Sequence, residues 1–190
     1  MQSLQVCPWQ AGNILTLSAR RYIHDPLRIL GAYISEGMTL MDVGCGMGYF
    51  TIPMALMTGA NGKVLAADLQ PQMLEGMLQN AEKAGVRSRI EPRLCGTDSI
   101  HIGDANATVD FAILFMMLHE VPDRERLVRE VCDALSMGGK ILFAEPVVHV
   151  RKKSFMRSLQ MMEQAGLTVI SKPRVMFCRS ALLEKTEICR

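Results

Sequence analysis

The sequence predicts an α/β fold in which helices cover a largely parallel sheet, and three observations support this fold class. First, short apolar runs that suit buried strands alternate with segments of helical spacing from residue 38 to about residue 170. Second, the first of these runs ends in a glycine-rich turn that leads directly into a helical segment. Third, prolines and glycines stand where the helices are expected to begin and end.

The individual elements follow from these signals in chain order. Strands are expected at Thr39–Val43, Lys63–Ala67, Arg89–Leu94, Val109–Leu114, Lys140–Ala144, Leu167–Ser171 and Arg174–Cys178. Helices are expected over Pro26–Ile34, from about Gly48 to Met57, from Pro71 to Gly85, from Pro122 to Leu135, and from Ser154 to Ala165. Met137-Gly138-Gly139 is expected to turn the chain ahead of the strand at Lys140, and Ala181–Leu183 to belong to a polar end.

Length and composition indicate one domain with an ordinary globular balance. Of the 190 residues, 49% are hydrophobic and 21% charged, and we expect a core over residues 38–190 preceded by a helical segment over residues 1–37. The net charge of +2 implies no strongly anionic partner such as a nucleic acid. The longest apolar stretch, Phe111 to Leu118, is too short to span a bilayer, so no membrane partner is expected.

The cysteines and the first residues indicate the compartment. None of the six cysteines stands within four residues of another, which excludes zinc-ribbon and C-x-x-C spacing. The first residues lack the basic and apolar regions of a signal peptide. We therefore expect reduced thiols, a cytoplasmic location and no metal site.

The most informative stretch is Leu40–Phe50, which reads LMDVGCGMGYF. An apolar run ends in an acid, three glycines alternate with other residues, and apolar residues with helical spacing follow. A turn without side chains lets a ligand lie against the backbone at a helix N-terminus, where free N–H groups favour an anionic group such as a carboxylate. Asp68, at the end of the next apolar run, suits both hydroxyls of a ribose.

The spacing of the glycines distinguishes between nucleotide ligands. Dinucleotide sites carry G-x-G-x-x-G, but Tyr49 stands at the position of the last glycine, and the third glycine comes one residue earlier. The pattern Asp42, Gly44, Gly46, Gly48 resembles motif I of the class I S-adenosylmethionine (SAM)-dependent methyltransferases, D-x-G-x-G-x-G. This resemblance implies SAM as the cofactor.

Further motifs extend the resemblance over nearly the whole chain from residue 38. Asp110 with the apolar residues after it resembles the fourth-strand motif of the family, and Leu135–Phe143, LSMGGKILF, resembles its L-x-x-G-G motif before the fifth strand. The family fold is a three-layer α/β/α sandwich with a seven-stranded, mostly parallel sheet whose last strand is antiparallel. The resemblance implies this fold and a methyltransferase activity for the present chain.

The cofactor contacts that the resemblance implies lie at the carboxyl ends of the strands, where open α/β sheets bind ligands. They are Asp42, Gly44, Cys45, Gly46, Met47, Gly48, Asp68, Leu69, Thr97, Asp98 and Phe115. Many family members carry G-D-A where this chain has Cys95-Gly96-Thr97-Asp98-Ser99, so either Asp98 or the backbone is left to hold the adenine. Cys45 is interpreted as a packing residue of the turn.

The segment after the fourth strand carries the candidate catalytic residues, His119 and Glu120. It resembles the corresponding segment of small-molecule methyltransferases, including the menaquinone/ubiquinone C-methyltransferases, in which a histidine commonly faces the transferred methyl group. A base is needed only where the acceptor must lose a proton; His119 has a suitable pKa range, and Glu120 can orient or replace it. The alternative is that His119 caps the next helix and Glu120 is solvated.

Three further residues are candidates for contact with the acceptor, namely Tyr22 and His24 in the N-terminal segment and Glu145 at the end of the fifth strand. The alternative for the N-terminal segment is a helix packed on the sheet with a solvated basic face. The basic run Arg151–Lys153 is likewise interpreted as solvated, because no aromatic residues interleave it for base stacking.

The sequence therefore predicts a SAM-dependent methyltransferase that acts on a small-molecule acceptor, with no nucleic-acid or membrane partner. The compact domain leaves little surface for a large substrate, and the N/D-P-P-Y motif of nucleic-acid amino-methylating enzymes is missing after the fourth strand. A non-catalytic SAM-binding protein of the same fold is one alternative, and an NAD-dependent oxidoreductase is another. Arsenite as acceptor stays open, although the positioned cysteines of such enzymes are not matched. The acceptor atom and the oligomeric state are also left open.

Overall fold

The computed structural model describes residues 18–96, 99–101 and 106–187 of the chain. The chain divides into two compact units, one covering Cys7–His101 and the other chiefly Ile102–Arg190. They are called the amino-terminal and the carboxyl-terminal unit below. Within the described ranges, every helix is too short or too polar to cross a membrane.

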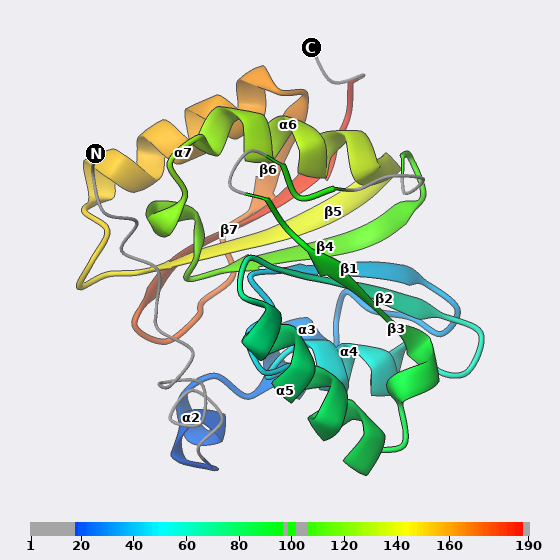
Figure 1. Cartoon of the computed structure of the whole chain (residues 1–190). Coiled ribbons are helices and arrows are strands. Elements are labelled where there is room, and N and C mark those ends of the chain that lie inside the picture. The colour runs from blue at the N-terminus through cyan, green and yellow to red at the C-terminus, as the bar shows by residue number, and fades with distance from the viewer. Residues whose placement is uncertain (1–17, 97–98, 102–105, 188–190) are drawn as a thin grey trace. The chain divides into compact units, whose positions relative to one another are not determined.

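Three parallel strands form the sheet of the amino-terminal unit, in the order β3 (Ile90–Leu94), β2 (Lys63–Asp68) and β1 (Thr39–Val43). Thr39 lies opposite Lys63 and Val43 opposite Ala67, so the carboxyl ends of β1 and β2 are side by side. Helices α4 (Thr51–Met57) and α5 (Pro71–Lys83) pack against β2, as Figure 1 shows in cyan and green.

Helix α5 has the start, the buried apolar face and the end that the sequence predicts. Pro71 occupies the first turn, where its missing N–H costs no hydrogen bond. The buried side chains follow helical spacing and are Met73, Leu74, Met77 and Ala81. Gly85 adopts a φ of +68° directly after the helix, a backbone conformation that glycine accepts readily.

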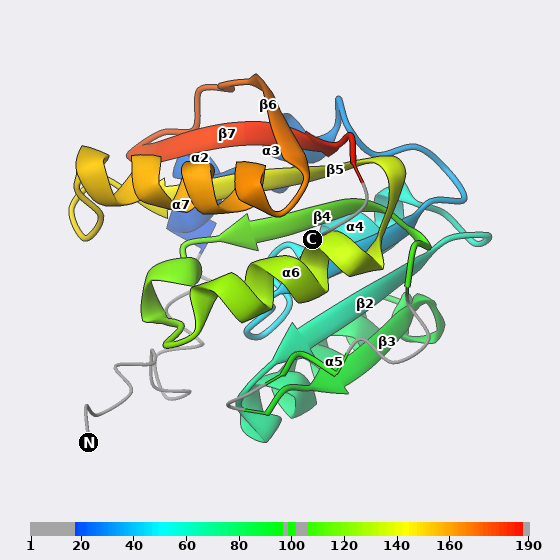
Figure 2. The same cartoon turned by 90° about the horizontal axis from the view of Figure 1, so that it is seen from above.

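Four strands form the sheet of the carboxyl-terminal unit, in the order β4 (Val109–Phe115), β5 (Leu135–Pro146), β7 (Cys178–Lys185) and β6 (Leu167–Ser171). Strands β4 and β5 are parallel, whereas β7 runs antiparallel to both of its neighbours. Helices α6 (Arg124–Ala134) and α7 (Lys152–Gln164) lie side by side along these strands, as the views in Figures 1 and 2 agree. Phe143 of β5 stacks on Phe155 of α7 with ring centroids 5.1 Å apart, which ties the helix to the sheet.

The strands make up a seven-stranded sheet that is mostly parallel, with its last strand antiparallel, and helices flank it. The predicted fold class is thereby confirmed. Short apolar runs gave the buried strands because a parallel sheet covered by helices hides both faces of each strand from water.

The predicted start of β5 is wrong. This strand begins at Leu135 instead of Lys140, and the expected turn at Met137-Gly138-Gly139 is part of it. Gly138 adopts a φ of +79°, and the register between β4 and β5 shifts between Val109 and Phe111. The glycines thus produce an irregularity within the strand, which local turn signals do not distinguish from a chain reversal.

The position of the last strand is also wrong in the sequence analysis. The strand is Cys178–Lys185, and residues 174–177 of the predicted strand Arg174–Cys178 precede it as a connecting segment. Ala181–Leu183, which was expected to lie in a polar end, is buried and pairs with β5 on one side and, in part, with β6 on the other. Tertiary pairing decides this case, because three apolar residues among charged neighbours carry little periodicity.

Two short helices, α2 (Ser18–Ile23) and α3 (Pro26–Leu30), precede β1 in the amino-terminal unit. The carboxylate of Asp25 accepts a 3.0 Å hydrogen bond from the Leu27 backbone N–H and so caps α3, which ends at Leu30 instead of the predicted Ile34. The predicted boundary between residues 37 and 38 stays a prediction.

Candidate functional site

Strand β1 delivers Asp42 into a fully enclosed position next to the glycine turn. The side chain of Asp42 is 3% exposed and accepts a 2.6 Å hydrogen bond from the hydroxyl of Thr51, the first residue of α4. Burial raises the pKa of Asp42 to about 6, and the Thr51 hydroxyl partly opposes this shift. Asp42 therefore joins the strand before the turn to the helix after it.

The turn itself depends on glycines at three alternate positions. Gly44, Gly46 and Gly48 have φ angles of +74°, +52° and +88°, which other residues rarely adopt. The backbone N–H groups of Gly44 and Cys45 both donate to the carbonyl of Ala67, at 2.8 and 3.0 Å, so the turn is fastened to the end of β2. The strand–turn–helix arrangement that the sequence predicts is thus present.

The carboxylate of Asp68 links the turn to the carboxyl end of β2. One oxygen accepts a 2.9 Å hydrogen bond from the N–H of Gly46, and the other accepts a 2.9 Å bond from the N–H of Gln70. The residue is 8% exposed, and burial raises its pKa while these backbone hydrogen bonds act in the opposite direction. The structure therefore brings the glycine turn and Asp68 together, as predicted.

These residues fit SAM. A Cβ added to Gly46 would meet no atom within 4 Å, so open space adjoins the backbone there. The carboxylate of Asp68 has about four lone-pair sites, so it can accept from a ribose hydroxyl in addition to its backbone donors. The side chain of Tyr49 stands where a dinucleotide site has its third glycine.

The remaining turn residues have packing roles in this structure. A Cβ on Gly48 would lie 2.8 Å from the Cγ of Met77, so this glycine permits close approach of α5. The carbonyl of Met47 accepts a 3.1 Å hydrogen bond from the side chain of Asn80, which also lies on α5. Cys45 is buried, and burial raises the pKa of its thiol, in keeping with the packing role that the sequence predicts for it. Leu69 is half-buried after β2.

The N-terminal helix α2 contacts the turn through Tyr49. The guanidinium of Arg20 lies over the Tyr49 ring, 4.2 Å from its centroid, and the Tyr49 hydroxyl donates a 3.0 Å hydrogen bond to the carbonyl of His24. His24 is buried, whereas Tyr22 is 88% exposed. Of the two N-terminal residues proposed to contact the acceptor, only His24 is enclosed by the protein.

The carboxyl-terminal unit contains a histidine held at two points by one carboxylate. Glu145, near the end of β5, accepts a 2.6 Å hydrogen bond from Nδ1 of His119 and a 3.0 Å bond from the backbone N–H of the same residue. The side chain of Glu145 is 2% exposed and that of His119 is 23% exposed. Such a pair fixes the imidazole with Nδ1 protonated and leaves Nε2 as the free nitrogen.

The sheet places these two residues together. Phe115, the last residue of β4, pairs with Ala144 of β5, and the next residue, Met116, donates a 2.8 Å backbone hydrogen bond to the Ala144 carbonyl. The chain then enters a short 3-10 helix, η3 (Leu118–Glu120), which carries His119 back toward Glu145. Phe115 itself, a predicted cofactor contact, is buried.

Other charged and aromatic groups surround His119. The hydrogen bond that the His119 ring donates to Glu145 is the main cause that raises the pKa of His119 above its ordinary value. The Nε2 atom lies 3.9 Å from a carboxylate oxygen of Glu120, and the ring of His149 stacks at a centroid distance of 5.9 Å. The side chain of Arg124 donates a 2.9 Å hydrogen bond to the His119 carbonyl and fixes its backbone.

Glu145, and not Glu120, accepts the hydrogen bond from Nδ1 of His119. The sequence analysis named Glu145 only as an acceptor contact, and it did not identify Thr51, His149 or Arg20 as parts of these sites. One sequence signal was available for Glu145: acids at the carboxyl ends of neighbouring parallel strands meet at one edge of a sheet. The predicted cofactor contacts Thr97 and Asp98 lie outside the described residues.

The described part of the chain contains free thiols but no cluster of metal-ligating side chains. Among the described cysteines, Cys45, Cys95 and Cys178 are free thiols, and the sulfur of Cys132 lies 3.1 Å from the carbonyl oxygen of Ala165. Among the described residues, His, Cys, Asp and Glu side chains do not gather in threes or more in an arrangement that could hold a metal ion.

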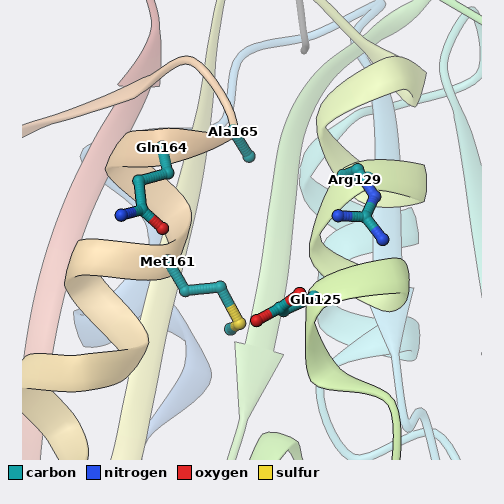
Figure 3. Close-up of a pocket in the computed structure, with 5 residues that line it drawn as sticks. All are labelled: Glu125, Arg129, Met161, Gln164 and Ala165. Carbon is teal, nitrogen blue, oxygen red and sulfur yellow. The ribbon is translucent and has the colours of Figure 1, made fainter.

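A shallow pocket between α6 and α7 contains none of the predicted site residues. It is lined by Glu125, Arg129, Met161, Gln164 and Ala165, and Figure 3 shows the α6 and α7 side chains facing one another across it. Its lining does not include the glycine turn, so we assign it no part in the chemistry.

Comparison with known proteins gives the family. A family model described as a methyltransferase domain matches residues 34–178, which is more than half of the chain. The solved structure of a SAM-dependent methyltransferase from Aquifex aeolicus superposes with a TM-score of 0.84 at 22% identity, covering 95% of this chain and all of that one. A SAM-dependent O-methyltransferase from Thermotoga maritima gives a TM-score of 0.65 at 20% identity, covering 87% and 65%.

Two curated relatives carry different names. The chain is 29% identical over 135 residues to protein-L-isoaspartate O-methyltransferase 2 of Arabidopsis thaliana, which is 71% of this chain and 43% of the relative. It is 26% identical over 140 residues to the ubiquinone/menaquinone biosynthesis C-methyltransferase of Salmonella arizonae, which is 72% of this chain and 55% of the relative. The chain thus spans about half the length of the curated relatives that it matches.

The glycine turn, the carboxylate of Asp68 and the seven-stranded sheet agree with the family match in residues and in geometry. The predicted family, cofactor and enzyme class are confirmed, and the oxidoreductase alternative is set aside. This chain belongs to the class I SAM-dependent methyltransferases.

Proposed function

We propose that this chain transfers a methyl group from SAM to a small-molecule acceptor that loses a proton, with His119 as the base that takes this proton. The pairing of His119 with Glu145 carries the proposal. SAM, when bound, supplies an electrophilic methyl group on a sulfonium. The turn from Gly44 to Gly48 and the carboxylate of Asp68 are the residues that we assign to holding it.

The geometry of the histidine supports a role as base. Its Nδ1–H donates to a carboxylate that is almost fully buried, so Nε2 carries the free lone pair. The negative charge of Glu145 stabilises the imidazolium that forms when Nε2 takes a proton. A buried carboxylate that grips both the ring and the backbone of one histidine holds the imidazole in one orientation.

Exposure of the histidine supports a small acceptor. Only 23% of its side-chain surface is accessible, because Glu145, Glu120 and His149 lie against it. A recessed base admits a small molecule more readily than a folded macromolecule. The proposed acceptor is therefore a small hydroxyl, thiol or carbon acid, and the proposed location is the cytoplasm.

The test uses labelled SAM with a panel of small phenols, thiols and quinols beside an isoaspartyl peptide. We expect transfer to a small acceptor, and we expect His119→Gln to lower kcat by on the order of 10²–10⁴-fold while SAM affinity stays unchanged. Glu145→Gln is expected to lower kcat as well, and Glu184→Gln is its control, because Glu184 forms a half-buried ion pair with Lys140 away from His119. Transfer to the peptide alone would contradict the acceptor class, and SAM binding without any transfer would favour a non-catalytic role.

A further inference from the structure

An apolar and basic surface is formed by the two loops at the carboxyl end of β5. The first loop leaves β5 with Val147 and Val148, which are 40% and 82% exposed, and the second enters β7 with Met176 and Phe177, which are 52% and 64% exposed. The N–H of Val147 donates a 3.0 Å hydrogen bond to the carbonyl of Phe177, so the two loops are joined. These four side chains are called the apolar tip below.

The protein holds the apolar tip in position with buried and hydrogen-bonded neighbours. Val150 and Val175, one in each loop, are 4% and 6% exposed and anchor the loops in the core. The side chain of Arg179 donates a 3.2 Å hydrogen bond to the carbonyl of Val150. Apolar side chains kept in water by such a scaffold point to an interaction site, because burying them inside the protein would be favourable.

The backbone conformation at Phe177 also indicates contact with a partner. Its φ of +57° lies in the left-handed region, which an aromatic residue rarely adopts. Glycine or asparagine would fit the backbone better. A large apolar side chain that is both exposed and unfavourable for its own backbone is explained by contact with something outside the chain.

The positive charge of the segment around the apolar tip favours a negatively charged partner. Residues 145–179 contain seven Lys or Arg and two Glu, a net charge of +5, whereas the whole chain carries +2. One of the two acids, Glu145, is buried against His119. The exposed cations adjoin the apolar tip in sequence on both sides and are Arg151, Lys152, Lys153, Lys172 and Arg174. Charges of one sign disfavour a second copy of the same surface.

We propose that the apolar tip and its basic flanks bind the surface of an anionic lipid bilayer. Exposed apolar side chains on loop tips enter the boundary between headgroups and acyl chains, and Lys and Arg beside them pair with anionic headgroups. No helix crosses the bilayer in this arrangement. The sequence analysis expected no membrane partner and a solvated basic run, because it did not place Val147–Val148 next to Met176–Phe177.

The test is co-sedimentation of the full chain with vesicles of phosphatidylcholine alone and of phosphatidylcholine mixed with an equal amount of phosphatidylglycerol. We expect binding to the anionic vesicles only, and a loss of binding as salt is raised. Each lysine beside an anionic surface contributes about fivefold, so Lys152→Gln with Lys153→Gln is expected to weaken binding ~25-fold. The pair Lys63→Gln with Lys83→Gln makes the same charge change on exposed residues of the amino-terminal unit and is expected to have no such effect.

The apolar contribution is tested with Phe177→Asn. Asparagine accepts the left-handed backbone, so this variant is expected to unfold at a temperature no lower than the native chain while binding weakens roughly tenfold or more. Met137→Asn is the control, because Met137 is 60% exposed near the opposite end of β5. Absence of binding to anionic vesicles, or equal binding by Phe177→Asn, would overturn the proposal. A dimer that dissociates on Phe177→Asn substitution would also overturn it and would assign the surface to a second copy of the chain. Retention on polyglutamate beads without vesicle binding would assign the surface to an acidic protein instead.

Discussion

The hydroxyl of Thr51 donates a 2.6 Å hydrogen bond to the carboxylate of Asp42, and both side chains are closed to water. Asp42 is the acid of the family motif, and Thr51 is the first residue of the helix after the glycine turn. The bond fixes the spacing between strand and helix. A buried carboxylate is stable only with such a partner, because an unpaired one loses its hydration without compensation.

Thr51→Val is therefore expected to destabilise the chain. Valine matches the shape of threonine but removes the hydroxyl donor, so the buried Asp42 retains only its backbone hydrogen bond with Thr51, at a cost of about 1–3 kcal/mol in the free energy of unfolding. Urea denaturation measures this change. Thr51→Ser retains the hydroxyl and serves as the control; equal losses in both variants would show that the methyl group, and not the hydrogen bond, carries the effect.

The raised pKa of Asp42 makes stability depend on pH. Because the pKa rises from 3.8 to about 6 on folding, the folded state holds the proton more tightly than the unfolded state. The associated stability is fully present below pH 3.8 and is lost as pH rises through 6, a change of about 3 kcal/mol. The difference in unfolding free energy between the native chain and Asp42→Asn, measured across this range, isolates the effect. A difference that does not vary with pH would contradict a raised pKa.

Asp68→Ala is expected to weaken SAM binding by roughly 1.5–3 kcal/mol, the scale for hydrogen bonds to a charged group. In the native chain the N–H of Gly46 donates a hydrogen bond to Asp68. The variant removes this bond, so the turn loses a hydrogen bond that holds it to β2 in addition to the proposed ribose contact. Isothermal titration with S-adenosylhomocysteine measures the affinity. Glu36→Gln changes an exposed acid in the same unit and serves as the control; it is expected to bind S-adenosylhomocysteine normally. If a folded Asp68→Ala variant kept the native affinity, Asp68 would not bind the ribose.

Gly46→Ala and Gly85→Ala form a matched pair. Both glycines have positive φ angles, +52° and +68°, and a Cβ on either would meet no protein atom within 4 Å. Each substitution is expected to cost about 1–2 kcal/mol of stability through backbone strain. Only Gly46→Ala is expected to weaken SAM binding as well, because its Cβ enters the space assigned to the ligand. Equal SAM affinity in the two variants would mean that the ligand does not approach Gly46.

The pair of His119 and Glu145 predicts the pH profile of methyl transfer. His119 must be neutral to accept a proton, so kcat/KM is expected to rise with pH through its pKa, which lies above 6.5. In Glu145→Gln the inflection is expected at lower pH, because the carboxylate that favours the imidazolium is gone. Titration of the His119 ring signals by NMR gives the same comparison without an acceptor. An inflection that stays in place would show that Glu145 does not control His119.

Local sequence signals predicted much of the fold and the cofactor turn. Strands β1 and β6 begin and end at the predicted residues, and α5 begins at Pro71 as expected. These elements are specified by neighbours in the chain, through apolar periodicity, a helix-starting proline and glycines that alone accept the turn. Asp68 was identified for the same reason, because it ends a strand at a fixed distance after the turn.

The sequence by itself thus determined the fold class, the family and the glycine turn with Asp68. Only the tertiary structure decided that Ala181–Leu183 is a strand, that Glu145 and not Glu120 holds Nδ1 of His119, and that Val147 lies beside Phe177. Each of these depends on residues that are 26 or more positions apart in the chain, or on pairing with another strand. Periodicity and spacing report what a residue does with its neighbours in sequence, whereas the register of the sheet sets which distant side chains share an edge.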